Sequence, residues 1–307
     1  MGFLELAELF TKLDRVKMNY KQLFFLICFF ALMISCKKSD RIPDDPQQGT
    51  ITISADESFR SVSEALTERY MALNPKTKIN LVIKKEDLGF LDLLENKVRV
   101  IVMSRELTTE EKEAYKLKID MKMEPAKFAA DAVVFVVPKN STRESITVEE
   151  LSNELNSDQK NIIFDATNSS NLNFVAQKLG TIPNKLKFSI INGNKNVVKE
   201  IGQYPNKIGA ISLNTLSRPY DKESEQLRNT IKILPVISKG KTFEPNMKNI
   251  KAMTYPFTRV LYFITNEAYY GLGNGFIRFS CQQIGQIVVE KEGLQPYTIF
   301  NREVQMR

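Results

Sequence analysis

The sequence predicts an α/β fold, because strand-like and helix-like segments alternate from residue 50 almost to the C-terminus. Short apolar or β-branched runs predict strands, and apolar residues at helical spacing predict helices. Two capping-box sequences, at residues 108–111 and 147–150, indicate helix starts within this alternation. No internal repeat or low-complexity tract interrupts it. This alternation is typical of mostly parallel sheets flanked by helices.

The expected elements follow one another in a regular order. Residues 60–73 place Val62, Leu66 and Tyr70 on one helical stripe, whereas residues 132–137 form an unbroken apolar strand before Pro138. The expected strands are 50–55, 78–83, 100–103, 132–137, 161–164, 188–191, 208–212 and 258–264. The expected helices are 60–73, 88–96, 108–116, 147–155, 170–179, 196–204, 275–282 and 284–291.

The N-terminal region contains an apolar run at residues 23–33 that follows Lys21. It is too short to span a bilayer, which needs about 20 apolar residues, but it fits a secretory signal, where roughly 7–15 are typical. The run leads into Met33-Ile34-Ser35-Cys36, which resembles the lipobox of bacterial lipoproteins. That motif implies a diacylglycerol on Cys36 and cleavage just before it. The alternative is an uncleaved membrane anchor in which Cys36 has no role.

The segments beside this signal carry no expected fold. Residues 1–17 include Glu5, Glu8 and Asp14, which are unusual in front of a signal, so we expect translation to start at Met18. Residues 37–49 are polar and rich in proline and aspartate, which predicts a tether between the lipid and the domain. The protein is therefore expected in the cell envelope, lipid-anchored on the extracytoplasmic side of a membrane.

The absence of histidine excludes several chemistries. Nucleophile activation by Ser-His-Asp or Cys-His is impossible as usually built, and so are zinc sites that use imidazole. Cys281 is the single cysteine after residue 36, so no internal disulfide is expected in the processed chain. Carboxylate hydrolysis, for example at Asp131 or Asp165, lacks any motif that places a nucleophile beside a base.

The charge balance is basic, at +7 for the whole chain. Removing the four basic and three acidic residues of positions 1–36 leaves +6. A positive field favours an anionic ligand or a membrane surface, although solubility explains it equally well. The charges are spread along the chain without an arginine-rich block, so nucleic-acid binding is not expected.

A set of ordered stretches resembles one family, the phosphate-binding proteins of bacterial ABC transporters, which belong to the type II periplasmic-binding class. Together they cover nearly all of residues 50–304 in the family's order. The stretches are ITISADESF (51–59), VIVMSRELT (100–108), FAADAVVFVV (128–137), KIGAIS (207–212), YPFTRVLY (255–262), GF (275–276), GQ (285–286) and GLQP (293–296).

The resemblance implies two α/β lobes joined by two crossover strands, each lobe a mixed sheet flanked by helices. Lobe 1 would comprise residues 49–130 plus 255–307, and lobe 2 residues 131–254. Ligand bound between the lobes would favour a closed form, which requires contacts from both. The family further implies a monomeric binding protein, not an enzyme, without cofactor or metal. Its partners would be inorganic phosphate or a similar oxyanion, and ABC permease subunits.

Four candidate ligand-binding residues lie in lobe 1. Ser58 and Phe59 begin the first helix, where the Ser58 hydroxyl and nearby N–H groups would hold an oxyanion, or Ser58 would be a helix cap. Ser104 and Arg105 follow a buried strand. Arg105 would grip an oxyanion in a bidentate manner, or would pair with a nearby acid such as Glu86 or Glu106.

Four further candidates lie in lobe 2. Ser169, Ser170 and Asn171 open a helix at the position of the family's Ser-Gly-Thr anion loop, with plain capping as the alternative. Asp165 stands four residues before Ser169, where the family usually has arginine. A protonated phosphate could donate a hydrogen bond to Asp165.

Lobe 1 also departs from the family pattern. Residues 84–88 read KKEDL in place of a Gly/Ser-rich turn, and Asp56 and Glu57 add negative charge to the first loop. The sequence therefore predicts an extracytoplasmic solute-binding lipoprotein of an ABC importer, with phosphate as the leading ligand. The alternative is a lipoprotein on the same scaffold whose diverged cleft serves protein interaction or sensing.

Overall fold

The computed structural model describes residues 45–298, which fall within one compact unit. The predicted signal segment, Cys36 and most of the tether lie outside the described residues, as do residues 299–307. Within residues 45–298, no helix is long and apolar enough to cross a bilayer.

The strands form one large mixed sheet in the order β2-β1-β3-β12-β4-β8-β6-β7, with β9 and β13 also paired to β4, and a small sheet of β11-β10-β5. Parallel pairs occur at the two ends of the large sheet, for example β1 with β2 and β6 with β8. The prediction of mostly parallel sheets is wrong. Strands β4 and β12 run antiparallel to each other and to their other main-sheet neighbours β3, β8, β9 and β13. The bounds are β1 Gln48–Ala55, β2 Lys76–Ile83, β3 Val100–Met103, β4 Ala126–Pro138, β5 Ile146–Thr147, β6 Ile162–Phe164, β7 Ser189–Ile190, β8 Ile208–Ser212, β9 Ile231–Leu234, β10 Val236–Ser238, β11 Lys241–Phe243, β12 Thr258–Thr265 and β13 Gln295–Pro296.

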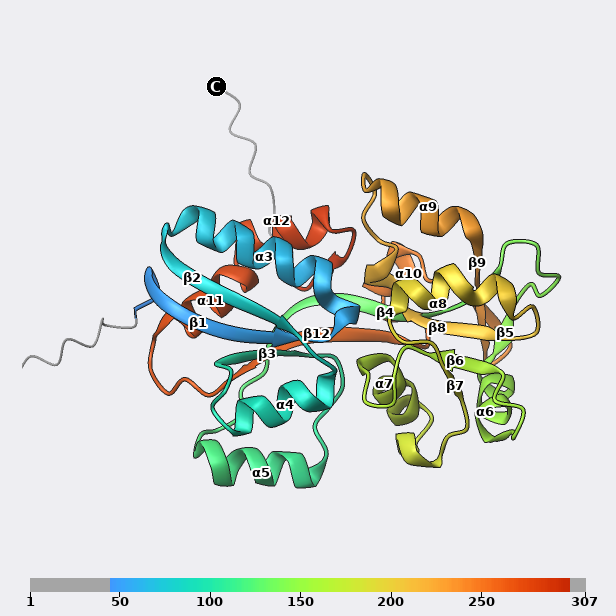
Figure 1. Ribbon diagram of the computed structural model, residues 1–307, viewed down its shortest axis with the longest axis horizontal. Coiled ribbons are helices and arrows are strands. Elements are labelled where there is room, and N and C mark those ends of the chain that lie inside the picture. Colours follow the sequence, from blue (N-terminus) through green and yellow to red (C-terminus); the bar gives the residue numbers. More distant parts are fainter. Residues whose placement is uncertain (1–44, 299–307) are drawn as a thin grey trace, which may run out of the picture. The chain divides into compact units, whose positions relative to one another are not determined.

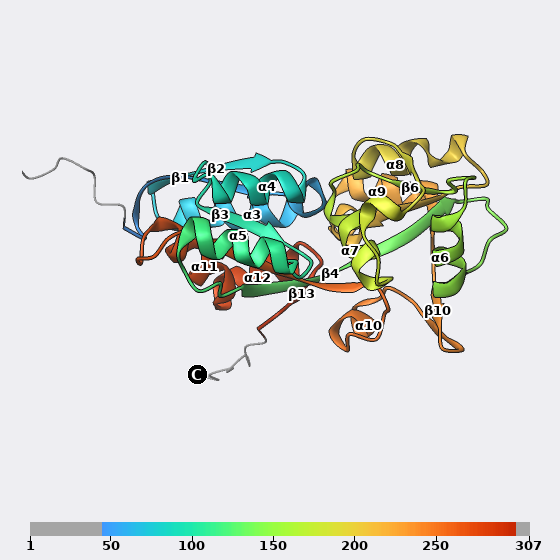
Figure 2. The ribbon, with the colours of Figure 1, turned by 90° about the horizontal axis from the view of Figure 1, so that it is seen from below.

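Helices lie on both sides of this sheet (Figure 1). At one end α3, α11 and α12 lie on one side of the strands, and α4 and α5 on the other; at the other end α8 and α9 lie opposite α6 and α7 (Figures 1 and 2). The bounds are α3 Arg60–Leu73, α4 Glu86–Leu94, α5 Thr109–Ile119, α6 Val148–Asn156, α7 Ser170–Lys178, α8 Asn194–Glu200, α9 Lys222–Thr230, α10 Met247–Lys251, α11 Leu272–Cys281 and α12 Gln283–Lys291. Short 3-10 helices are η1 Glu57–Phe59, η2 Pro183–Lys185, η3 Ile201–Gln203 and η4 Leu213–Thr215.

Separate hydrophobic clusters form at the two ends of the sheet. One cluster draws its residues from 130–257, whereas the other two draw theirs from 51–129 and 261–294. Burial of these apolar side chains is the main favourable contribution to folding. The division into lobes 1 and 2 remains a proposal, and we use these names for the predicted segments.

Strands β4 and β12 are the segments that reach from one end of the sheet to the other. The Asp131 and Arg259 residues are register partners at this point, and their fully buried side chains form an ion pair with an Nη2–Oδ2 distance of 2.7 Å. A buried charge needs such a partner, because an unpaired charge in a low-dielectric interior is strongly unfavourable. The pair therefore links β4 to β12 through their side chains.

Candidate functional site

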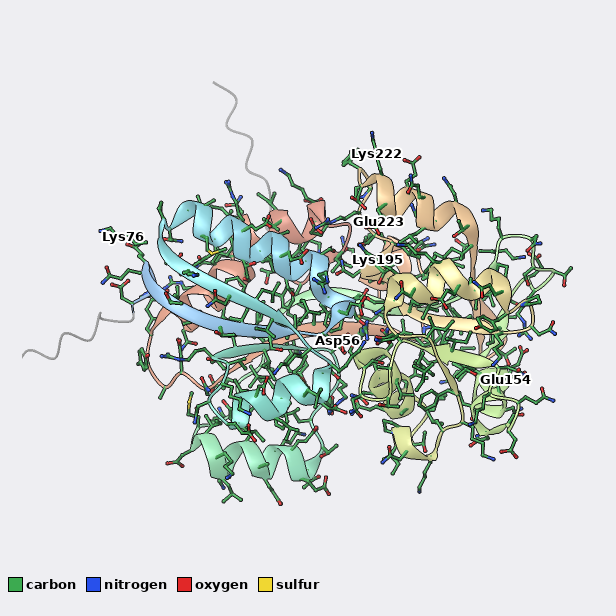
Figure 3. The ribbon with its side chains drawn as sticks, viewed as in Figure 1. Asp56, Lys76, Glu154, Lys195, Lys222 and Glu223 are labelled. Atoms are coloured by element: carbon green, nitrogen blue, oxygen red, sulfur yellow. The ribbon has the colours of Figure 1, made fainter. Side chains whose placement is uncertain are left out.

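Three main-chain N–H groups from separate elements converge on the carboxylate of Asp56. Ser58 N–H donates to Oδ1 at 2.9 Å, Glu86 N–H to Oδ2 at 3.0 Å, and Ser170 N–H to Oδ2 at 3.2 Å. Ser58 lies in η1, and Glu86 and Ser170 are the first residues of α4 and α7. Figure 3 shows Asp56 between the elements of lobe 1 and those of lobe 2.

This arrangement directs N–H groups from both predicted lobes at one carboxylate. The N–H groups in the first turn of a helix have no intrahelical acceptor, and the helix dipole there favours negative charge. The Asp56 oxygens stand where oxygens of a bound oxyanion would accept the same hydrogen bonds. Ser170 is 0% exposed, and its buried hydroxyl oxygen has no hydrogen-bond partner. Such an unsatisfied group would gain a partner from a ligand oxygen.

The Asp56 carboxyl is almost completely buried. Burial and the nearby Asp165 raise its pKa above the ordinary value, opposed by Lys85 and by the hydrogen bond from Ser58. The three N–H donors favour the ionised form, whereas the neighbouring acid favours the protonated form. The protonation of Asp56 therefore depends on its burial, on the charges of Asp165 and Lys85, and on the hydrogen bond from Ser58.

Asp165 and Lys85 form an ion pair between the two lobes. Their Oδ2–Nζ distance is 2.8 Å, and Asp165 is 0% exposed. Asp165 also accepts a hydrogen bond from the Asn171 amide at 3.0 Å, and the Asn194 amide donates to the Ser58 hydroxyl at 3.2 Å. Burial lowers the pKa of Lys85, but the attraction of Asp165 and Asp56 outweighs it and raises the pKa overall.

Glu86 and Arg105 form a second charged group beside Asp56. Glu86 Oε1 accepts hydrogen bonds from the Ser104 N–H at 2.8 Å and hydroxyl at 3.0 Å. Arg105 Nε lies 3.2 Å from Glu86 Oε2, and the same guanidinium makes two 2.7 Å hydrogen bonds to Glu111. Burial raises the pKa of Glu86 to about 6, although Arg105 opposes the shift.

The buried ring of Phe59 packs against the Arg259 guanidinium. Its ring lies 4.7 Å from the Arg259 guanidinium carbon, which is 5.8 Å from the ring of Phe174 in lobe 2. Cation–π contacts of this kind are favourable when the cation is desolvated. Asp131, which sequence analysis considered for hydrolysis, accepts hydrogen bonds from Arg259 and from the Ser212 hydroxyl, so its role here is structural.

A groove of about 320 Å³ opens between the lobes next to this cluster. Ser58, which donates to Asp56, and Asn194, whose amide donates to Asp165 at 3.4 Å, both line it. Figure 3 shows Lys195 and Glu223 close together; an ion pair joins them at 2.5 Å, and both line the groove. The groove therefore borders the site at Ser58 and Asn194.

The structure brings most of the predicted ligand-binding residues together. Ser58, Asp165, Ser170 and Asn171 lie in one hydrogen-bonded network around Asp56, with Phe59 behind it. Ser169 caps α7, as its capping alternative predicts, because its hydroxyl accepts a hydrogen bond from Leu172 N–H. Arg105 and Ser104 contact Glu86, as the salt-bridge alternative for Arg105 predicts. Ligand contact by all eight residues stays a prediction.

Sequence reasoning missed two features of the site. It treated Lys85 and Asp165 as separate departures from the family pattern, although they are changes of opposite sign that form one ion pair. It also treated Asp56 as surplus negative charge rather than as the acceptor for both lobes. The opposite charges of Lys85 and Asp165 could have indicated their pairing from the sequence. The position of the Asp56 carboxylate depends on the folded geometry and could not.

Comparison with known proteins agrees with this architecture. The family model of the PBP superfamily domain matches residues 43–283. The phosphate-binding protein PstS of Borreliella burgdorferi is 23% identical over 284 residues, which cover 86% of this chain and 93% of that protein.

Two solved structures share the fold. A protein described as a phosphate ABC transporter substrate-binding protein, from Clostridium perfringens and with bound phosphate, has a TM-score of 0.66 and 20% identity, covering 81% of this chain and 100% of that one. An ABC-type phosphate transport receptor from Vibrio cholerae has a TM-score of 0.61 and 17% identity over the same shares. With the family model spanning most of its length, the chain belongs to the PBP superfamily.

Proposed function

We propose that this protein is a solute-binding receptor of an ABC importer, not an enzyme, and that it binds phosphate or a similar oxyanion between its lobes. The observation that carries the proposal is the convergence of N–H groups from α4, α7 and Ser58 on one point, where a carboxylate now stands. A site of this kind recognises an oxyanion through main-chain dipoles. Relatives described as phosphate-binding proteins support phosphate as the first ligand to test.

The permease would recognise the form of the receptor in which the lobes have closed on the ligand. Donors from both lobes make the closed form the one that a bound oxyanion favours, since differential contacts are what shift a conformational equilibrium. Direct contacts between the predicted lobes, such as the hydrogen bond from Glu106 N–H to Gln177 Oε1 at 3.0 Å, support a closure of this kind.

Isothermal titration calorimetry with inorganic phosphate at low ionic strength tests the ligand. We expect saturable heat with phosphate and none with chloride at the same ionic strength, because the site offers several directed donors rather than diffuse positive charge. Absence of heat at millimolar phosphate, both for the wild-type protein and for a variant without the Asp56 carboxylate, would remove phosphate as the ligand.

The lipid anchor belongs to the same proposal. A diacylglycerol on Cys36, with residues 37–49 as tether, would hold a monomeric receptor on the extracytoplasmic side of a membrane, near its permease. Expression in a bacterium with labelled fatty acid is expected to label the wild-type protein, and Cys36→Ser to abolish the label. Equal labelling of both would contradict lipidation at Cys36.

A second candidate is a protein-interaction or sensory lipoprotein on the same scaffold. The observation that favours it is the surplus of acids at the site, where Asp56, Glu57, Glu86 and Asp165 face Lys85 and Arg105. Affinity purification from solubilised membranes separates the two. Recovery of importer membrane subunits supports the receptor, whereas reproducible recovery of a different membrane protein, without phosphate binding, supports the second candidate.

A further inference from the structure

We propose that the Asp56 carboxylate is an internal substitute for the ligand, which occupies the oxyanion site and must leave before an external oxyanion can bind. The inference rests on the proposed function, since it assumes that the same N–H groups receive the cargo. Asp56 belongs to lobe 1, yet its Oδ2 accepts from α4 and from α7 in lobe 2. The side chain therefore makes the cross-lobe contact that closure on a ligand would make.

The three main-chain N–H groups of the site already donate to Asp56, so none of them is left for a second anion. Ser58 and Glu86 N–H already donate at 2.9 and 3.0 Å to Asp56. A carboxylate beside a phosphate dianion is also repelled by it, and water screens this repulsion poorly at a site as buried as this one. An entering oxyanion must therefore displace the Asp56 side chain or meet it in its protonated form.

Neighbouring charges make Asp56 displaceable rather than permanently fixed. Asp165 and Glu86 are both buried and both repel its charge. Lys85 attracts it from the other side but is already paired with Asp165 at 2.8 Å. The hydrogen bonds favour occupancy of the site and the buried acids oppose it, so the side chain is poised between an inward and an outward position.

Occupancy of the site by Asp56 would lower the apparent affinity for phosphate. When a binding-competent state is only partly populated, apparent affinity falls by that fraction. If Asp56 fills the site in about nine of ten molecules, removing its carboxylate raises phosphate affinity about tenfold. The substitution also leaves Glu86 and Ser170 N–H without an acceptor in the ligand-free protein.

The test compares the wild-type protein with Asp56→Ala, using phosphate titration calorimetry and amide hydrogen exchange followed by NMR. We expect about tenfold tighter phosphate binding by the variant. We also expect faster exchange at Glu86 and Ser170 without ligand, with protection restored by phosphate. Unchanged or weaker affinity overturns the proposal, and so does unchanged exchange at both amides.

The two readouts separate this inference from the proposed function. Faster exchange in Asp56→Ala, with no phosphate binding by either protein, would refute phosphate as the ligand while leaving Asp56 as the acceptor between the lobes. If Asp56→Ala does not fold, Asp56→Asn keeps the size of the side chain and replaces charge-assisted hydrogen bonds by weaker neutral ones. It is expected to shift affinity in the same direction by a smaller factor.

Two further variants control the result. Glu267 is a buried carboxylate that accepts from Gly273 and Asn274 N–H at 3.0 and 2.9 Å within lobe 1. Glu267→Ala is expected to speed exchange at those two amides and to leave phosphate affinity unchanged. In the Asp56→Ala background, Ser170→Pro removes both the N–H and the hydroxyl of the first helical position, where proline is tolerated. This double variant should lose the gain in affinity; retention of the full gain would place the phosphate elsewhere.

Discussion

At the scale of single residues, two departures from the family pattern carry opposite charges and form an ion pair. Lys85 in lobe 1 and Asp165 in lobe 2 stand where the family pattern has a Gly/Ser-rich turn and an arginine, and they meet at 2.8 Å. A charge buried alone would be strongly unfavourable, whereas a hydrogen-bonded pair is tolerated. Because the two residues lie far apart in sequence, their pairing became visible only when the fold brought the lobes together.

Glu86 gives a prediction at the same scale. Its pKa is raised by burial from 4.5 to about 6, so the folded state binds the proton more tightly than the unfolded state. This contribution to stability is present below the unfolded pKa and is lost as the pH rises through the folded pKa. Between pH 4.5 and 7 the wild-type protein should lose about 1.6 kcal/mol of unfolding free energy relative to Glu86→Gln.

Urea unfolding of both proteins at several pH values measures this difference. Glu113→Gln, which removes an exposed carboxylate from α5, is the matched control and should show no comparable pH dependence. A difference between the wild-type protein and Glu86→Gln that stays constant over this pH range would refute the raised pKa and the burial that explains it.

At the scale of elements, sequence patterns were most informative where burial and capping coincide. The structure confirms helix 60–73 and strands 100–103 and 208–212 at their expected bounds. Helix α9 was not expected, because its polar sequence KESEQLRNT buries just Ser224 and Leu227 and shows no apolar stripe. The short strands β9, β10 and β11 were missed as well, since three or four residues give too little periodicity to read.

The capping box of α5 supplies a prediction for an element. Thr108 Oγ1 accepts from Glu111 N–H at 3.2 Å, and Glu111 Oε2 accepts from Thr108 N–H at 2.8 Å. Removing a threonine cap destabilises a protein by about 1 kcal/mol. Thr108→Ala should therefore lower the free energy of unfolding by about 1 kcal/mol, while the exposed neighbour Thr109→Ala should change it by less than about 0.5 kcal/mol. Equal effects in urea unfolding would show that the cap contributes nothing.

At the scale of the molecule, the sequence pattern predicts the α/β class and the resemblance predicts the mixed sheet. The predicted majority of parallel strands is not observed. Strands β4 and β12 cross between the two ends of the sheet and impose antiparallel pairing on their neighbours. Local periodicity carries no information about strand direction, so this feature could come only from the family or from the fold. The network around Asp56 has the same origin, because Ser58, Glu86 and Ser170 are brought together by tertiary structure.

The most direct test of the account is a crystal structure of the protein grown with phosphate at a concentration that saturates the titration. We expect phosphate between the lobes, with its oxygens accepting hydrogen bonds from the N–H groups of Ser58, Glu86 and Ser170. The Asp56 side chain should then be turned away from these three groups. A structure in which phosphate is absent or bound elsewhere, while Asp56 keeps all three hydrogen bonds, would contradict it.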